Sequence, residues 1–401
     1  MIGLHNKGTL KTSNKNIINN HTNNEHWKYT SIKHFKSCNL NFVPIKNKLK
    51  KVIPKSNEII LYNGNVYCYG NEIKKNNLHV CNIKHAIRKN INNINKYFNK
   101  ILPYDNDLYL NYNTSLFDRG MYLFFPPNTK LNKHINIKHI IDEGENSSFL
   151  NCRNYIHSSE NVVASIVNYE ELDINQCINT ACEIYIEKES KIEIINYSKK
   201  PNTKQLLNCA ALIKSNSLLQ FHAIDMNSKL VKNNYYIKLG GINSQCLFNG
   251  CNIANNDDHI DNYIEIRHLD KYTLSDLNYK IITDKTSKSI LFAKSIIEKN
   301  SSNSEAYQNN NNIMLSNKST INSNPQLEIY NDDVKCSHAS TTGQIDNEAI
   351  YYMRTRGINK KNAKKLILGS FLNSVFENIE NITVQNYFKK KVTKYLNELE
   401  N

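Results

Sequence analysis

The chain has 401 residues, of which 40% are hydrophobic and 22% charged, and its formal net charge is +15 at pH 7. This composition supplies enough apolar side chains for a sizeable core, and no run of about 18 apolar residues indicates a membrane span. The lysines are scattered rather than gathered with exposed aromatic residues, so the charge indicates an AT-rich coding sequence rather than nucleic-acid binding.

The start of the chain and its cysteines bear on the compartment. The first residues contain no apolar segment of the kind found in a secretory signal. Only Glu25 is acidic before Glu58, and such a basic, acid-poor start also fits an organelle transit peptide, although no Arg-rich amphipathic segment accompanies it. The ten cysteines form no CxxC pair and are most simply reduced, buried thiols. We therefore expect a cytoplasmic protein, from a bacterium with a reduced, AT-rich genome, and keep a plastid as the alternative.

Residues 1–110 form an N-terminal region of mixed α/β character. The segment Ile59–Gly70 predicts a β-hairpin, because Asn63 and Gly64 make a tight-turn dipeptide between strand-forming residues. The segment 79–102 predicts a helix, because its apolar residues recur at steps of three and four. These residues are Ile83, Ala86, Ile87, Ile91, Ile94 and Phe98.

Residues 111–341 predict a β-rich core. Short apolar alternations such as "CEIYIEKESKIEIINYS" and "YIEIRHL" are separated by turns rich in Asn and Asp, and no helix-length periodic segment interrupts them. This pattern leaves a sandwich, a barrel and a β-helix open. No exact repeat is visible, so the pattern alone does not select the β-helix.

Residues 342–401 predict a C-terminal helical bundle. Asp346 and Asn359 are suitable N-caps for two helices, and Gly357 is suited to end the first of them. The apolar stripes of these helices exceed what their mutual packing needs, so we expect part of the surface to dock a partner. The residues assigned to docking are Leu366, Ile367, Phe371 and Val375.

One stretch stands out from the Asn- and Lys-rich background. The segment "PQLEIYNDDVKCSHASTTGQIDNEAIYYMRTRGI", which ends at Ile358, resembles the SufB/SufD family of iron–sulfur cluster assembly scaffold proteins, and its SufD branch fits best. The segment "NEHWKYTSI", with Trp27 and Tyr29, resembles a second element near the N-termini of that branch. One departure is Ala339, which stands where the family usually has Gly after the His, and Ala resists the positive φ that Gly permits.

The resemblance implies a mainly β fold, with a right-handed parallel β-helix between the N-terminal region and the C-terminal helices. It also implies a non-catalytic scaffold subunit that forms a heterodimer with SufB and docks the ATPase SufC. We find no Gly-rich phosphate-binding loop in this chain, which is consistent with a partner that supplies the ATP chemistry. No tightly bound cofactor, nucleic acid or membrane is implied.

Cys336 and His338 are the candidate cluster-assembly and metal-ligating residues. A thiolate and an imidazole both bind iron, and a spacing of two on a strand places both side chains on one face. The resemblance implies a transient iron or iron–sulfur cluster at the SufB interface. Asp332 and Asp333 are assigned to solvated surface, and Trp27 and Tyr29 to packing.

Two rival functions remain open on the sequence. One is a thiol- or metal-dependent enzyme in which Cys336 and His338 act as an activated pair, although no third orienting residue is visible. The other is a stand-alone β-helix protein that binds a polymer, which would not need the C-terminal helices.

Overall fold

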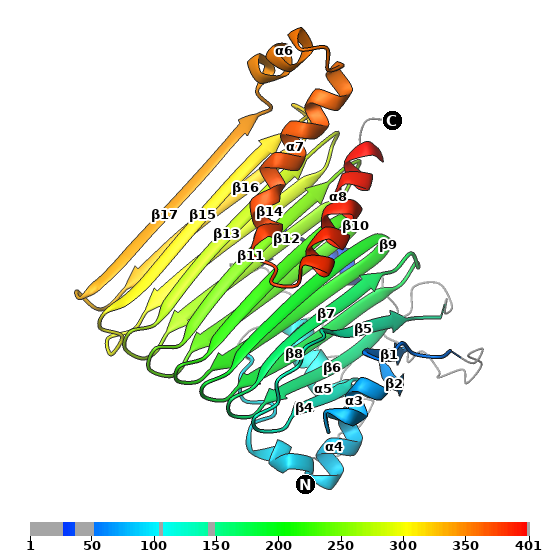
Figure 1. Cartoon of the computed structure of the whole chain (residues 1–401), viewed down its shortest axis with the longest axis vertical. Helices are drawn as coiled ribbons and strands as arrows, with labels where there is room; N and C mark the ends of the chain where they lie inside the picture. The colour runs from blue at the N-terminus through cyan, green and yellow to red at the C-terminus, as the bar shows by residue number, and fades with distance from the viewer. Residues whose placement is uncertain (1–26, 37–51, 104–106, 143–148, 399–401) are drawn as a thin grey trace.

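The strands of the protein wind into one long solenoid, with helices at its two ends and along its outside (Figure 1). The computed structural model describes residues 27–36, 52–103, 107–142 and 149–398. Its strands are Glu58–Tyr62 (β1), Asn65–Tyr69 (β2), His79–Asn82 (β3), Met121–Phe125 (β4), Ile135–Ile140 (β5), Phe149–Ser158 (β6), Val163–Glu171 (β7), Cys177–Ile186 (β8), Lys191–Ile213 (β9), Leu218–Leu239 (β10), Gln245–Ala254 (β11), His259–His268 (β12), Leu274–Thr283 (β13), Lys288–Ile297 (β14), Ser304–Met314 (β15), Thr320–Ile329 (β16) and Val334–Gln344 (β17).

Most helices come before or among the first strands in the chain, and the others follow the last strand. Before and among the first strands they are Lys33–Lys36 (α2), Asn71–Lys75 (α3), Ile83–Lys89 (α4), the 3₁₀ helix Ile91–Lys96 (η2) and Leu108–Leu116 (α5). After the last strand they are Asn347–Thr355 (α6), Lys360–Glu377 (α7) and Ile382–Glu398 (α8). None of the helices in the described ranges is long and apolar enough to cross a bilayer.

Each coil of the solenoid contributes one strand to each of two faces. The first face contains β7, the first half of β9, the first half of β10, β11, β13, β15 and β17. The second face contains β6, β8, the second halves of β9 and β10, β12, β14 and β16. All these neighbours pair in parallel, so Val163, Lys191, Leu218 and Gln245 are successive partners. This confirms the expected parallel β-helix over a sandwich or a barrel.

Left-handed backbone conformations make the bends between the two faces. At one bend, residues with φ between 56° and 60° stack from coil to coil, and the backbone N–H of each donates to the backbone carbonyl of the next coil. The members of this stack are Asn161, Glu189, Asn216, Asn243, Tyr272 and Asn303. Asn tolerates this region better than other non-glycine residues, which explains the Asn-rich turns of the sequence.

The core fills the space between the two faces with inward-pointing apolar side chains. Phe221 and Phe248 stack across neighbouring coils with ring centroids 5.1 Å apart, and Tyr235 meets both rings edge-on. Gly250, two residues after Phe248, leaves room for the ring of its register partner Tyr279, because a Cβ at position 250 would lie 2.1 Å from that ring. Successive coils therefore share one continuous core.

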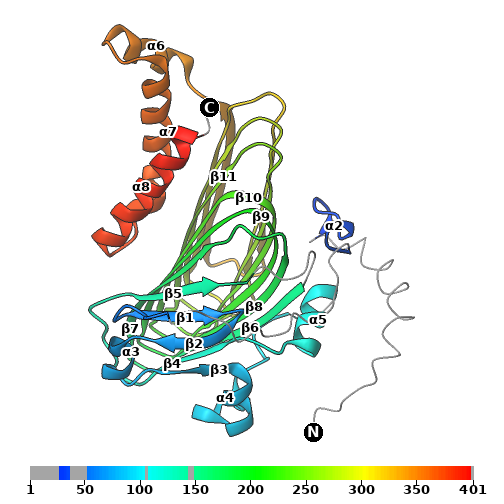
Figure 2. The ribbon, with the colours of Figure 1, turned by 90° about the vertical axis from the view of Figure 1, so that its right-hand side faces the viewer.

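The two outer faces of the solenoid are covered by different ends of the chain (Figure 2). The helices α7 and α8 lie against the first face, where Leu372, Phe376 and Phe388 pack on outward-pointing Ile195 and Ile253. On the second face, α4, η2 and α5 cover outward-pointing aromatic residues of the first coils. Trp27 is 5% exposed and packs beside them against Phe35 and Tyr109.

The local expectations hold at the caps and the hairpin but not at the first long helix. The pair β1–β2 is antiparallel across Asn63 and Gly64, and Asp346 accepts from the backbone N–H groups of Glu348 and Ala349. Asn359 caps α7 in the same way, and Gly357 has a φ of +84°. The prediction of one helix over 79–102 is wrong. Residues 79–82 pair with β4 as β3, and left-handed Asn90, Asn92 and Asn93 break the rest into α4 and η2.

Candidate functional site

The last coil of the solenoid, made of β16 and β17, has no further coil beside it in the part of the chain that the structure describes. Among the described strands, β17 pairs only with β15, and β16 only with β14. Cys336 and His338 are in register with Ala306 and Gln308 of β15, which are 0% and 4% exposed and point into the core. Partner residues of a parallel pair point to the same side of the sheet. Cys336 and His338 therefore lie on the inward side of the last coil, where the solenoid is open.

The exposure of these two side chains follows from their place at the open end. His338 is exposed, whereas Cys336 is half-buried against Ala306. Burial raises the pKa of the Cys336 thiol, and a hydrogen bond with the backbone of Ala306 offsets only part of that rise. The thiol is therefore protonated at neutral pH, and no contact on this strand prepares it as a nucleophile.

Polar side chains continue this inward column along β17. Ser340 Oγ lies 2.7 Å from Ser323 Oγ of β16, and Asn312 Nδ2 donates to Thr342 Oγ1 at 3.1 Å. Inward positions of the preceding coils are mostly apolar, so the core becomes polar as it approaches its open end. Ala339 lies inside β17 without a positive φ, so the site needs no glycine at this position.

The other expected site residues lie at different places. Asp332 and Asp333 are exposed in the turn before β17, and the Asp333 carbonyl accepts from the backbone N–H of Asn303. On α7, Leu366 is 54% exposed, while Val375 is fully buried against the first face. Ile367 and Phe371 are half-buried, and Lys280 Nζ lies 4.5 Å from the Phe371 ring centroid. Of these four docking candidates, Leu366 is the one open to a partner.

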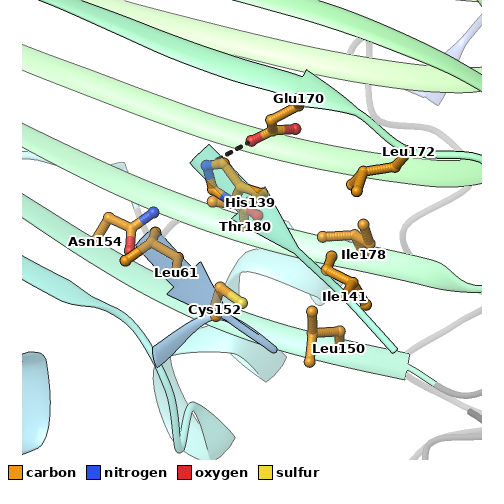
Figure 3. Close-up of a pocket in the computed structure, with 11 residues that line it drawn as sticks. Leu61, His139, Ile141, Leu150, Cys152, Asn154, Glu170, Leu172, Ile178 and Thr180 are labelled. Atoms are coloured by element: carbon orange, nitrogen blue, oxygen red, sulfur yellow. Dashed lines mark ion pairs between the residues drawn. The ribbon is translucent and has the colours of Figure 1, made fainter. Parts of the chain in front are cut away.

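A polar cluster inside the first coils was missed by the sequence reasoning. His139 Nε2 lies 2.7 Å from Asn168 Oδ1 and 3.6 Å from Glu170 Oε1 (Figure 3). Buried Lys200 makes a close ion pair with the same carboxylate. Burial alone would raise the pKa of Glu170, but Lys200 and His139 outweigh it and lower the pKa to about 2.

Two cavities open onto this cluster from inside the solenoid. One has a volume of about 10 Å³ and is the pocket drawn in Figure 3. The other has a volume of about 60 Å³ and is also lined by Cys182 and Cys209. Nowhere in the described part of the chain do three or more His, Cys, Asp or Glu side chains form a group that could hold a metal ion. A signal in the sequence that could have indicated the two thiols is the spacing of residues 182 and 209, which equals one coil.

Comparison with known proteins covers most of the solenoid. Residues 139–371 match the family model described as SUF system FeS cluster assembly, SufBD core domain. The chain is 29% identical over 150 residues to the iron–sulfur cluster assembly protein SufD of Escherichia coli, which covers 37% of this chain and 36% of that protein. It is 24% identical over 317 residues to the iron–sulfur cluster assembly SufBD family protein ycf24 of Porphyra purpurea, covering 75% and 63% of the two chains.

A plant relative extends the comparison. The chain is 23% identical over 329 residues to the chloroplastic iron–sulfur cluster assembly SufBD family protein ABCI8 of Arabidopsis thaliana, covering 77% of this chain and 57% of that protein. The chain thus spans less than two thirds of the length of each of these curated relatives. The matched residues 139–371 run from β5 into α7 and include both Cys336 and His338.

Proposed function

The chain belongs to the SufBD family of iron–sulfur cluster assembly proteins, and we propose on this premise that it is a scaffold subunit of a SUF assembly complex. The observation that carries the proposal is the open last coil, where Cys336 and His338 lie on the inward side and no further coil of the described strands covers them. Iron and sulfide are then the cargo, held for a time at this end by thiolate and imidazole ligands. The chain itself performs no ATP chemistry in this proposal.

The partner at the open end is a second subunit of the same family, SufB. An edge strand presents unpaired N–H and C=O groups that favour pairing with another strand, and both β16 and β17 have such an edge. The inward column that ends in His338, Ser340 and Thr342 is polar and exposed, so a matching end would cover it and enclose the two candidate ligands. A heterodimer of two solenoids joined end to end satisfies both features.

The ATPase SufC is the second proposed partner, and it docks on α6 and the first half of α7. Of this part, α6 lies beyond the end of β17, and α7 runs back from it along the solenoid (Figure 1). Its exposed apolar side chains are Tyr351, Tyr352 and Leu366, at 69%, 60% and 54% exposed. Exposed aromatic residues of this size are typical anchors of protein interfaces.

The rival readings have weaker support. An enzyme built on Cys336 and His338 would need an activated thiol and an orienting group, whereas burial raises the pKa of this thiol. A stand-alone polymer-binding solenoid does not explain the exposed apolar residues of α6. For the compartment, we propose a bacterial cytoplasm, with a plastid as the alternative because the Arabidopsis relative is named chloroplastic.

Co-expression with SufB and SufC tests the proposal. The native chain should co-purify both partners in one peak by size exclusion. Leu366→Asp should lose SufC and keep SufB, while Ile382→Asp, at a 63% exposed position at the other end of the helical hairpin, should keep both. Retention of SufC at native yield by Leu366→Asp together with Tyr351→Ser and Tyr352→Ser would refute the docking surface.

A further inference from the structure

Two thiols face each other across one step of the solenoid. Cys182 of β8 and Cys209 of β9 are direct register partners on parallel strands. Both point inward, since Ile184 and Ala211, two residues further along each strand, belong to the same central core. A hydrogen bond joins the two thiols and, together with burial, raises the pKa of Cys209. The pair is therefore a preformed contact rather than a coincidence of sequence.

The pair lies on the wall of an internal cavity. Cys182 is half-buried although it points inward, because it lines the cavity of about 60 Å³. Facing it across the cavity are His139, Asn168, Glu170 and Asn196 of the other face. The smaller cavity shares His139, Asn154, Glu170 and Thr180 with the larger one and reaches Gly64 and Cys152 (Figure 3). A small ion thus has polar side chains along the space that leads to the thiols.

The spacing of the strands decides which chemistry suits two such thiols. Neighbouring strands lie about 4.7–4.9 Å apart, and two bonds of about 2.3 Å from thiolate sulfur to metal span about 4.6 Å in a straight line. A disulfide needs its Cβ atoms about 3.5–4.5 Å apart, closer than the step between in-register parallel strands. The spacing of two in-register parallel strands therefore suits a linear S–metal–S bridge better than an S–S bond.

The ligand count selects the kind of metal. Zinc sites take four ligands in most proteins, and soft thiolates favour Cu(I) among the metals that accept fewer. No third His, Cys, Asp or Glu joins the pair within the described residues. We propose that Cys182 and Cys209 form a two-coordinate site for a soft monovalent cation of the Cu(I) type, inside the solenoid and separate from the open end. Binding would replace the shared S–H···S proton: two neutral thiols and one Cu(I) give an anionic dithiolate complex and two protons.

Anaerobic titration of the full-length chain with Cu(I), against a bicinchoninate competitor, tests the site. A Cys336→Ser background removes the thiol at the open end. In that background the chain should hold one Cu(I) per molecule and release two protons. Among the described residues, His139 and Glu170 are the other ionisable side chains on the cavity wall. Cys182→Ser and Cys209→Ser should each weaken this binding by at least 100-fold.

A third thiol supplies the matched control. Cys246 is also buried and inward-pointing, but its register partners are Leu219 and Ser275. Cys246→Ser should therefore keep the bound Cu(I), and circular dichroism should show that all three variants remain folded. X-ray absorption of the one-equivalent complex should show two sulfur neighbours and no nitrogen or oxygen.

Several results would overturn the proposal. One is that Cys182→Ser competes with bicinchoninate for Cu(I) as well as the Cys336→Ser background does. Another is a third ligand in the X-ray absorption spectrum. A third is that Cys246→Ser loses as much Cu(I) as Cys182→Ser and Cys209→Ser. If mild oxidation with glutathione disulfide forms a Cys182–Cys209 disulfide, detected by mass spectrometry, the two thiols are a redox pair and the metal-site proposal is wrong. SufB and SufC binding takes no part in these measurements, so the inference can fail independently of the assembly role.

Discussion

The backbone N–H of Glu380 donates to the carboxylate of Glu193 at 3.0 Å, joining two residues that are 187 positions apart. Glu380 lies in the short link between α7 and α8, and Glu193 points outward from β9 on the first face. Ser165 Oγ donates to the other carboxylate oxygen, Oε2, at 2.6 Å, and His222 Nε2 lies 3.6 Å from Oε1, the oxygen that accepts from Glu380. Burial raises the pKa of Glu193, but its hydrogen bonds outweigh burial and leave the pKa below its usual value.

Glu193→Ala should loosen the α7–α8 hairpin without unfolding the solenoid. The backbone N–H of Glu380 and the half-buried Ser165 hydroxyl both lose their acceptor, and the loss of one such hydrogen bond costs about 0.5–1.5 kcal/mol. Hydrogen exchange should quicken in α8, while the amides of β12 and β14 keep their protection. Glu160→Ala is the control, because that carboxylate is 57% exposed and pairs with Lys188 at the surface. Equal protection of α8 in both variants would show that the carboxylate does not hold the helices.

Asp225→Asn should flatten the pH dependence of stability between about pH 4 and pH 6. Burial raises the pKa of Asp225 to about 6, and Lys200 and the hydrogen bond from Asn233 offset only part of that rise. A raised folded pKa gives stability that is full below the unfolded value and is lost as the pH rises through 6. Asn carries no charge, so the variant should be more stable than the native chain at pH 7.5, by about 1–3 kcal/mol.

Urea titrations at pH 4, 5, 6 and 7.5 measure this effect. Asp173→Asn, at an exposed carboxylate of the same solenoid, should follow the native profile. Asp258, whose pKa burial also raises to about 6, keeps part of the pH dependence in the Asp225 variant. A native-like loss of stability above pH 5 in Asp225→Asn would contradict the assignment.

His338→Ala should leave the isolated chain as stable as before, while cluster assembly in the proposed complex with SufB and SufC falls sharply. The side chain is exposed at the open end, and surface substitutions of this kind usually change stability by less than about 0.5 kcal/mol. Thermal melting and iron content of the purified complex separate the two effects. His338→Cys should recover part of the iron, because thiolate also binds it.

Cys336→Ser is the neighbouring comparison for His338→Ala. Its thiol rests on Ala306, so a small change in melting temperature is expected together with any change in iron content. A His338→Ala complex with normal partners and normal iron would remove His338 from the site.

Asn243→Val should destabilise the solenoid by about 1–2 kcal/mol, because a side chain with a branched Cβ does not tolerate the left-handed region. Asn243 has a φ of 59°, and its Nδ2 donates to Asn216 Oδ1 of the adjacent coil at 3.1 Å. Asn243→Gly should cost only a few tenths of a kcal/mol, because Gly adopts this φ freely. Asn309→Val inside β15 is the control, and urea midpoints measure all three. An equal effect of the two valine variants would mean that backbone conformation is not the cause.

The sequence predicted those features that depend on a few neighbouring residues. Asp346, Asn359 and Gly357 serve as caps because a cap needs only a suitable side chain and an adjacent helix. The Asn63–Gly64 turn was found for the same reason. The helix over 79–102 failed because three Asn residues adopt left-handed conformations, and the apolar spacing carries no information about that choice.

The internal cluster could not be predicted from the sequence, because it depends on the number of residues in each coil. His139, Glu170, Cys182 and Cys209 come together only when each coil is stacked on the next. That period is hidden, because equivalent bend positions hold Asn216, Asn243 and Tyr272 in turn and the coils differ slightly in length. Cys336 and His338 were predicted as site residues through their motif, while their inward orientation at the open end needed the register of β15 and β17.

The length of α7 has a consequence for how many coils the protein can have. Lys280 Nζ on β13 donates to the Phe371 carbonyl, Asn378 Nδ2 donates to Asn249 Oδ1 on β11, and the link to α8 ends at Glu193 on β9. The helix has 18 residues, which is about 27 Å at 1.5 Å per residue. Five strand spacings from β17 back to β9 make about 24 Å. An added coil would carry the start of α7 about 4.8 Å away from its anchor on β9, so a lineage that gains or loses a coil must also change this helix by about three residues.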